Sequence, residues 1–329
     1  MTQGSIGRRV LCASTFAAML VGCAADAATQ AASLCALTPP SVTQSLDIPV
    51  VGRESARRVI DVPPDAELEI VASEQNVDVM LELPDLGSIA DNPARRLGPE
   101  RIVARTGGEP QLAVVVRGKE RNATQGRVHI DVIQLASVRT RCDNARALLA
   151  QGDAGYARAQ LAARGERVTI TGSVREEYAA AAASYDSAIR ALEDDGPSPL
   201  LAHALLAAAA AYYQDLQDWK GAETRSERAA TTYGDVGDTY GVARSRAMRA
   251  AASMEVALSM PAGPHSTRSS SASALLARTR EEFDDIATFH AQRGERFDQA
   301  LAANNLGIAY YYEGRFDQAL AAYGLARPL

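Results

Sequence analysis

The side chains with the greatest catalytic potential in this 329-residue chain are its four histidines and four cysteines. The histidines are His129, His203, His265 and His290. None of them occurs in an H-E-x-x-H motif, at Cys-His zinc spacing or in a nucleophile elbow. Only Cys142 and His129 suggest a thiol dyad, and Cys142 is better explained as half of a disulfide. We therefore predict no catalytic residue, no metal ligand and no cofactor.

Three pairs of adjacent acidic residues are the other candidates for catalytic groups: Glu176-Glu177, Asp194-Asp195 and Asp284-Asp285. General acid–base catalysis needs carboxylates that converge on one substrate. Adjacent residues of a helix point about 100° apart, so these pairs do not converge. We interpret them as solvated helix faces.

Residues 1–23 have the character of an export leader. An arginine pair precedes the apolar segment Val10–Val21, which is too short to cross a bilayer as a normal helix. The following LVGC, Leu20–Cys23, resembles a bacterial lipobox. That resemblance implies a lipid on Cys23 and a periplasmic or outer-membrane lipoprotein that meets the membrane through its lipid anchor only. Ordinary signal cleavage at Ala25-Asp26-Ala27 is the alternative.

Two further cysteines flank the first folded region. Cys35 lies in residues 24–44, which we interpret as a linker, and Cys142 follows the region. An oxidising periplasm would allow one disulfide to close the ends of that region. Two free thiols too far apart to join are the alternative.

The composition indicates a globular chain. Its residues are 47% hydrophobic and 22% charged, but only 5% are aromatic, which favours helices packed through small residues. The formal net charge of −6 gives no overall basic field. We therefore predict no nucleic-acid partner.

Residues 45–138 contain short runs rich in Val and Ile that alternate with polar residues, as in Glu67-Leu68-Glu69-Ile70. Turn formers such as Pro63-Pro64-Asp65 and Gly107-Gly108 separate the runs. Six or seven strands at this spacing indicate an antiparallel β-sandwich. With the ESARRVIDV segment at Glu54–Val62, the pattern resembles the prepeptidase-C-like β domains of secreted bacterial proteins.

Residues 139–329 change to Ala- and Leu-rich segments with helical spacing, separated by Gly, Pro and Ser. The string RFDQALAA occurs twice here, at Arg296–Ala303 and Arg315–Ala322. An internal repeat of helical character indicates a repeat architecture. We expect the two copies to begin the two helices of one hairpin.

This hairpin resembles a tetratricopeptide repeat, a helix–turn–helix unit. The matching residues are Leu306, Gly307, Tyr310, Gly314, Ala319, Tyr323 and Ala326. We expect Gly307 and Ala319 to face each other where the helices cross, with Tyr310 and Tyr323 around the crossing. The predicted fold class is thus multi-domain β + α, an antiparallel β-sandwich followed by an α-helical tetratricopeptide-type solenoid.

An earlier unit aligns in the same frame through Ala209, Ala210, Tyr213, Gln217, Trp219, Ala222, Ser226 and Ala229. It departs from the pattern at Gln217, which stands in place of the turn glycine, and at Ser226, which stands in place of the aromatic residue. The helix after Gly237 parallels the one after Gly294, and we interpret Pro261–Ser273 as a polar loop. We expect about two complete units after some atypical helices. Because no polar cap follows, the array looks truncated or continues into another segment.

The order of leader, β domain and repeats with ALxxNNLGxxYY character resembles the front part of proteobacterial CHAT-domain proteins. In that family a caspase-like cysteine peptidase domain follows the repeats. Nothing in this sequence matches its catalytic His and Cys. One functional alternative is therefore a regulatory N-terminal fragment of such a peptidase, although this chain itself is predicted not to be an enzyme.

Our first functional hypothesis is an exported scaffold or adaptor that binds a protein or peptide in its helical groove. The predicted contact residues are Asn304, Asn305, Ile308 and Tyr311. Solvent exposure or helix-to-helix hydrogen bonding would equally explain the two asparagines. A third hypothesis is a structural envelope protein whose β domain binds peptidoglycan or a surface polymer.

Overall fold

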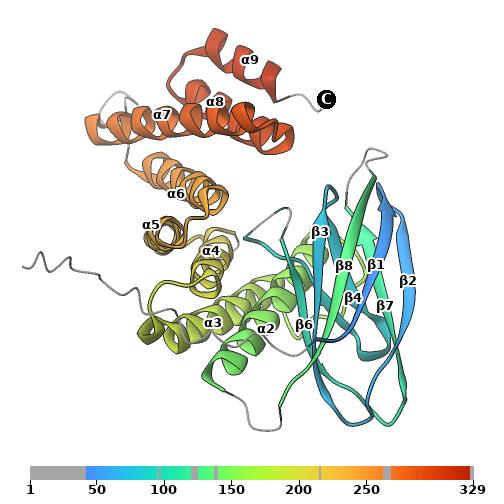
Figure 1. The fold of residues 1–329 in the computed structure, drawn as a ribbon. Coiled ribbons are helices and arrows are strands. Elements are labelled where there is room, and N and C mark those ends of the chain that lie inside the picture. Colours follow the sequence, from blue (N-terminus) through green and yellow to red (C-terminus); the bar gives the residue numbers. More distant parts are fainter. Residues whose placement is uncertain are drawn as a thin grey trace, which may run out of the picture. The chain divides into compact units, whose positions relative to one another are not determined.

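The computed structural model describes residues 42–94, 96, 98–119, 125–136, 140–214, 216–261 and 268–326. Within these ranges lie two antiparallel four-stranded sheets followed by eight α-helices (Figure 1), which confirms the predicted fold class. No helix in the described ranges is both long enough and apolar enough to cross a membrane.

The two sheets form a sandwich around one apolar core. The strands are β1 (Val42–Val51), β2 (Ser55–Asp61), β3 (Glu67–Gln75), β4 (Val79–Leu83), β5 (Ser88–Ala90), β6 (Glu100–Arg105), β7 (Gln111–Gly118) and β8 (Gln125–Gln134). One sheet has the order β1-β8-β3-β6 and the other β2-β7-β4-β5. Alternate residues of each strand point inward, so Ile70 and Ile130 of the first sheet meet Leu81 and Val114 of the second in one buried cluster.

Two strands differ from the sequence-based expectation. β1 begins at Val42 instead of residue 45, and β5 adds a three-residue strand after a short 3-10 helix, Pro84–Leu86. Pro49 weakens the strand pattern of β1, because proline cannot donate a ladder hydrogen bond. It is tolerated because β1 is an edge strand, and Ile48 and Val50 still reach the core.

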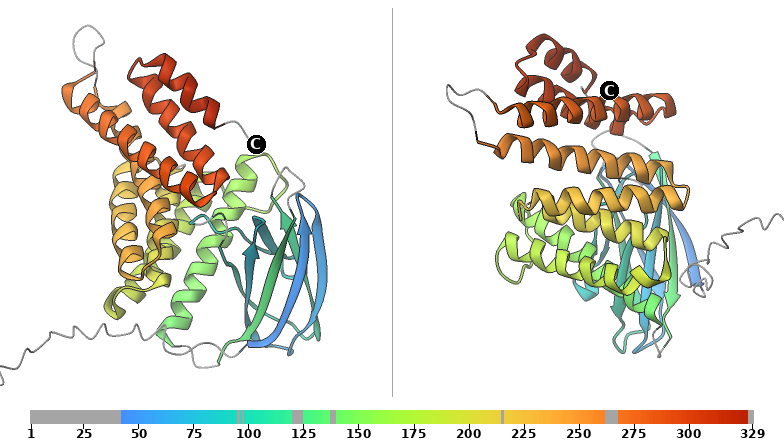
Figure 2. Two further views of the ribbon diagram at one scale, coloured as in Figure 1. Left: turned by 45° about the horizontal axis from the view of Figure 1, so that its top comes forward. Right: turned by 90° about the vertical axis from the view of Figure 1, so that its left-hand side faces the viewer.

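The helices pack in sequence, each against the next. They are α2 (Arg141–Ala163), α3 (Val174–Leu192), α4 (Pro199–Tyr213), α5 (Trp219–Asp235), α6 (Thr239–Ser259), α7 (Ser270–Arg293), α8 (Arg296–Tyr312) and α9 (Phe316–Leu325). Additional contacts join α2 to α4, α4 to α6 and α6 to α8. The even-numbered helices α2 to α8 therefore form one continuous row, which we call the inner row (Figures 1 and 2).

Side-chain caps set several helix starts. Thr140 and Ser173 each form a reciprocal capping box, with Asp143 and Glu176 as partners. Ser269 caps α7, whose backbone is helical from Ser270, so the polar loop predicted through residue 273 ends earlier. Residues 262–267 of that segment lie outside the described ranges.

The acidic pair at the start of α3 corrects our interpretation of solvated faces. Glu176 is the partner of Ser173 in the capping box, and it accepts a hydrogen bond from the Ser173 N–H at 2.7 Å. Glu177 is buried, accepts from the Thr171 N–H at 2.8 Å and forms an ion pair with Arg158 at 3.1 Å. Adjacent positions on a helix face different surroundings, and here one of them faces α2.

Left-handed residues occupy the turns between helices. Gly237, Gly294 and Gly314 have φ values of 76°, 71° and 77°. Gln217, which the sequence aligned with Gly314, has φ of 54°. The earlier unit therefore has the same turn as the last one, with a side chain where glycine is favoured.

Tyrosine rings cover glycines at three helix crossings. A Cβ added to Gly307 would lie 2.6 Å from the ring of Tyr323, so the ring, rather than Ala319, lies nearest to this glycine. Equivalent approaches join Gly152 to Tyr185 and Gly241 to Tyr233, both at 2.4 Å. In the earlier unit the same two positions hold Ala210 and Ser226, where a smaller partner leaves room for a methyl group.

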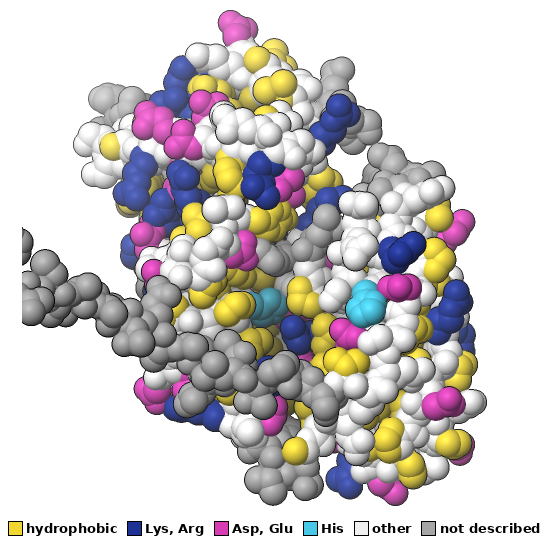
Figure 3. Space-filling view, in the orientation of Figure 1, with side chains coloured by type: hydrophobic (Ala, Val, Ile, Leu, Met, Phe, Trp, Pro, Cys, Tyr) yellow, Lys and Arg dark blue, Asp and Glu magenta, His cyan; other side chains and the backbone are white. Residues whose placement is uncertain are grey.

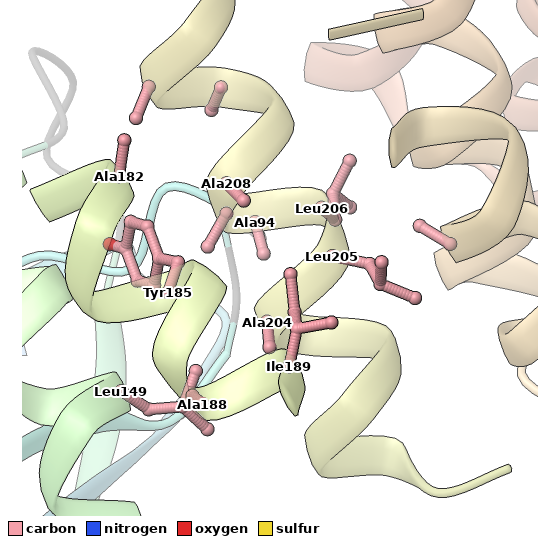
Figure 4. Close-up of a cluster of buried hydrophobic side chains, with 14 of the residues drawn as sticks. Ala94, Leu149, Ala182, Tyr185, Ala188, Ile189, Ala204, Leu205, Leu206 and Ala208 are labelled. Atoms are coloured by element: carbon pink, nitrogen blue, oxygen red, sulfur yellow. The ribbon is translucent and has the colours of Figure 1, made fainter. Parts of the chain in front are cut away.

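The sandwich and the helices are joined through α2, which packs against β5 and β6. A residue of the loop between those strands also contributes to the core of the helices. This residue, Ala94, is fully buried in a cluster that includes Tyr185, Ala204 and Ala208 of α3 and α4 (Figure 4).

We predict that alanine has opposite effects on the free energy of unfolding at two glycines of the last hairpin. Gly307→Ala should lower the free energy of unfolding by about 1–3 kcal/mol, because the new methyl group meets the Tyr323 ring. Gly324→Ala, with open space around its Cβ, should raise it by up to about 1 kcal/mol. Chemical denaturation measures both, and equal effects would exclude a tight crossing at Gly307.

We also predict that Gln217→Gly stabilises the chain. Removing the side chain relieves a strain of about 1–2 kcal/mol in the left-handed backbone. Glycine also gives the unfolded chain more backbone entropy, which offsets part of this gain in stability. The net gain should be about 0.5–1 kcal/mol in urea denaturation. The reverse change, Gly314→Gln, is the matched control and should lose a similar amount.

Candidate protein-interaction site

The four predicted contact residues do not share one environment on α8. Asn304 and Asn305 are half-buried. Ile308 packs against Met254 and Leu276 in a cluster between α6, α7 and α8, so its side chain is engaged within the array. Tyr311 is 55% exposed and is the member of the set most accessible to a partner.

Large exposed hydrophobic side chains gather on the last two helices. Within the described helices, all of them lie on α8 and α9: Phe297, Leu301, Tyr311, Tyr312, Phe316, Leu320 and Leu325. We call this set the α8–α9 apolar surface. Hydrophobic side chains are visible over α9 at the top of Figure 3. The repeated octapeptide explains part of the set, because each copy contributes one exposed Phe and one exposed Leu.

Three aromatic rings of this set contact one another edge to face. The ring of Tyr311 lies 5.5 Å from Tyr312 and 5.7 Å from Phe316, centroid to centroid. The guanidinium of Arg268 lies 5.1 Å from the Tyr312 ring. Rigid aromatic groups beside arginine are the side chains most enriched at binding hot spots.

Arginine side chains link neighbouring helices from α5 to the end of α8. Arg249 of α6 bonds to Glu227 of α5 and to Glu282 of α7, and so links three helices. Arg280 of α7 forms an ion pair with Glu313, after α8, at 3.2 Å. Planar guanidinium groups suit such multiple carboxylate contacts. The network links α5, α6 and α7 to one another, and α7 to the residue that follows α8.

Charged groups are buried where the sandwich meets the loop of residues 91–99. We call this group the junction cluster; its members are Glu74, Asp78, Asp91, Glu100 and Lys119. The Lys119 Nζ lies 2.8 Å from Asp91 and 3.0 Å from Asp78. Glu74 accepts hydrogen bonds from the backbone N–H groups of Val79 at 2.6 Å and Gly98 at 3.0 Å.

Burial raises the pKa of three carboxyl groups in this cluster. It raises the pKa of Glu74 to about 9, helped by the charge of Asp78, and that of Asp78 to about 6 despite Lys119. Burial and the charge of Glu74 also raise the pKa of Glu100, whose two carboxyl oxygens have no hydrogen-bond partner among the described residues. Several carboxyl groups therefore share one lysine and retain protons to unusually high pH.

Each of the three described histidines lies close to a carboxylate. His129 Nδ1 lies 2.9 Å from Asp47, and this hydrogen bond raises the pKa of the imidazole. His290 Nδ1 lies 2.7 Å from Glu295, and His203 Nε2 lies 3.5 Å from Asp153. His265 lies outside the described residues. No group of three or more described His, Cys, Asp or Glu residues is arranged to hold a metal ion.

Cys142 is disulfide-bonded and so is not a free nucleophile for His129. Its predicted partner, Cys35, lies outside the described residues, as does the lipidation candidate Cys23. The Cys35–Cys142 pairing and the lipid anchor therefore stay predictions. Sequence reasoning missed the junction cluster, because its members come from five separate places in the sandwich.

Comparisons with known proteins do not assign the chain to a family. No family model matches the chain, and no curated protein sequence matches it. A solved structure with some similarity is a multi-domain immunophilin from Arabidopsis thaliana, with 9% sequence identity and a TM-score of 0.27 over 75% of this chain and 98% of that chain. This TM-score is too low to support a conclusion. Membership of the tetratricopeptide or CHAT families stays a prediction.

The junction cluster predicts a loss of stability with rising pH. A carboxyl group that keeps its proton in the fold but loses it in the unfolded chain lowers the free energy of unfolding as pH rises from its unfolded pKa to its folded pKa. The decrease is up to about 1.4 kcal/mol per pH unit for each group. Glu74 sets the window from about pH 4.5 to about 9.

Glu100→Gln should reduce this slope, because the amide is neutral and replaces a carboxyl group without hydrogen bonds to described residues. Urea denaturation at pH 5, 7 and 9 measures it. Glu109→Gln, on the exposed β6–β7 turn, is the control and should keep the wild-type slope. A wild-type stability that rises from pH 5 to 9 would contradict the account.

Proposed function

We propose that this chain is a protein-interaction scaffold that acts at the cell envelope and binds its partner through the α8–α9 apolar surface. One observation carries the proposal: the exposed large hydrophobic side chains of the described helices are confined to α8 and α9. So many large apolar side chains seldom gather on a protein surface that contacts only water.

The chemistry of the surface supports a protein partner. Phe316 and Leu320 are 59% and 69% exposed, and Tyr311 contributes an amphipathic ring between α8 and α9. Apolar anchors with an aromatic centre and arginine at the rim are typical of protein interfaces. The arginine network from α5 to α8 supports the surface, because little conformational entropy is then lost on binding.

The proposed location is outside the cytoplasm. The lipobox-like Leu20–Cys23 segment motivates a lipid anchor in the periplasm or outer membrane. The disulfide at Cys142 supports an oxidising compartment, since structural disulfides are rare in reducing ones.

We predict that Tyr311→Ser, Phe316→Ser and Leu320→Ser, made together, reduce partner capture at least tenfold. The measurement is affinity capture from an envelope extract of the cells that make the protein, with each captured protein quantified against wild type. Val59→Ser is the matched control, because Val59 is 56% exposed on the outer face of β2. Circular dichroism must show equal helix content. Unchanged capture by the triple variant would refute the proposed surface.

A further inference from the structure

Helix α9 presents one row of exposed residues along its length, which we call the α9 ridge: Phe316, Leu320 and Gly324. The three are spaced four residues apart, so they lie along one ridge of the helix. Phe316 and Leu320 are 59% and 69% exposed, and a Cβ added to the exposed Gly324 would meet nothing within 4 Å. Another side of α9 buries Ala319 and Ala322. Among the described elements α8 is the main neighbour of α9, which lies at the outer end of the helices (Figures 1 and 2).

The helical array shows how its own helices achieve close contact. At three crossings of consecutive helices an aromatic ring lies over a glycine: Gly152 under Tyr185, Gly241 under Tyr233 and Gly307 under Tyr323. A glycine lets the ring approach the helix backbone, because no Cβ lies in the way. A large ring opposite a glycine is therefore the recurrent close contact between helices of this chain.

The α9 ridge carries both halves of one more such contact. Phe316 supplies an aromatic ring, Gly324 supplies a glycine with open space above it, and Leu320 lies midway between them. With a rise of about 1.5 Å per residue, each half lies about 6 Å from Leu320 along the helix axis. One helix cannot place its own ring over its own glycine. A second α9, turned end for end about Leu320, places each copy's ring over the other copy's glycine.

Charge and ring packing favour this arrangement. Asp317 is the only charged residue of α9, so two such helices can pack with little loss of charge hydration. The end-for-end arrangement also places the two copies of Asp317 at opposite ends of the contact, where they do not face each other. The ring of Tyr311 lies 5.7 Å from that of Phe316, centroid to centroid. This contact limits the motion of the Phe316 ring, which lowers the entropy lost on binding.

We propose that the α9 ridge is a self-association surface, and that a second copy of this chain binds it in an antiparallel, two-fold arrangement centred on Leu320. This proposal rests on the proposed scaffold function, because it names the partner of one part of the α8–α9 apolar surface. In a two-fold interface every contact away from the axis occurs twice. One helix pair thus buries two phenylalanine–glycine contacts and one leucine–leucine contact.

The test exchanges the two halves of the contact. Sedimentation velocity of the full chain over a concentration series measures the dissociation constant of the dimer. Gly324→Phe opposes two rings and Phe316→Gly opposes two glycines, so each should raise that constant at least about tenfold. The double variant restores a ring over a glycine and should return to within about threefold of wild type. A monomeric wild-type chain, or a double variant as weak as either single variant, overturns the proposal.

The four proteins are matched in all other respects. Within one copy the open space at Gly324 and the exposure of Phe316 allow both changes, and circular dichroism should show equal helix content. All four contain the same residues 1–41, so association through those residues would be common to all of them. Only an antiparallel pairing of α9 predicts recovery in the double variant.

Cysteine cross-linking locates the axis without altering either half of the contact. Leu320→Cys places two thiols beside the two-fold axis, where oxidation with copper phenanthroline should join most of the chain into a covalent dimer on a non-reducing gel. Val59→Cys, at a 56% exposed position on β2, is the matched control and should not rise above the wild-type background. Equal amounts of dimer from the two variants overturn the proposal.

The two proposals fail separately. A purified chain that stays monomeric, with capture from the envelope extract that still depends on Tyr311, Phe316 and Leu320, overturns self-association and identifies a different protein as the occupant. A purified chain that dimerises as described, with capture from the extract that the triple variant leaves unchanged, refutes the wider scaffold function and supports the pairing of α9.

Discussion

Close approach between helices through small side chains is the constraint on which the array depends. Gly152, Gly241 and Gly307 each lie under a tyrosine ring, and α4 buries a nearly continuous run of alanines. Because such contacts leave no spare volume, each crossing tolerates one large residue opposite one very small residue. The same tight packing explains why Ala94 fits the inner row.

The sequence predicted the parts of the fold that depend on local patterns. Alternating Val and Ile in β3, β7 and β8 identified the sandwich, and Gly314 and Gln217 aligned two turns that share a left-handed backbone. The duplicated octapeptide was correctly assigned to two helices, since its first copy begins with α8 at Arg296 and its second begins at Arg315, the residue before α9. These signals survive because turn geometry and periodicity are set within a few residues.

Features that depend on distant residues were not predictable in the same way. The sequence of residues 91–99 has the composition of an ordinary turn, and nothing local shows that Ala94 would be buried among helices. Ile308 was assigned to a groove because its helix was recognised, but the neighbouring α6 and α7 determine where its side chain lies. Lys119 meets Asp78 and Asp91, which are distant from it in the sequence, so the raised pKa of Asp78 had no pattern in the sequence.

Pro49 has a consequence for how many copies can coexist on one surface. It interrupts the row of N–H donors along β1, the outermost strand of its sheet, and so removes a template on which another sheet could extend. Molecules held at high local density would otherwise be able to join edge to edge into longer sheets. The same proline that obscured a strand in the sequence thus makes this edge of the sandwich a poorer template for pairing with a further strand.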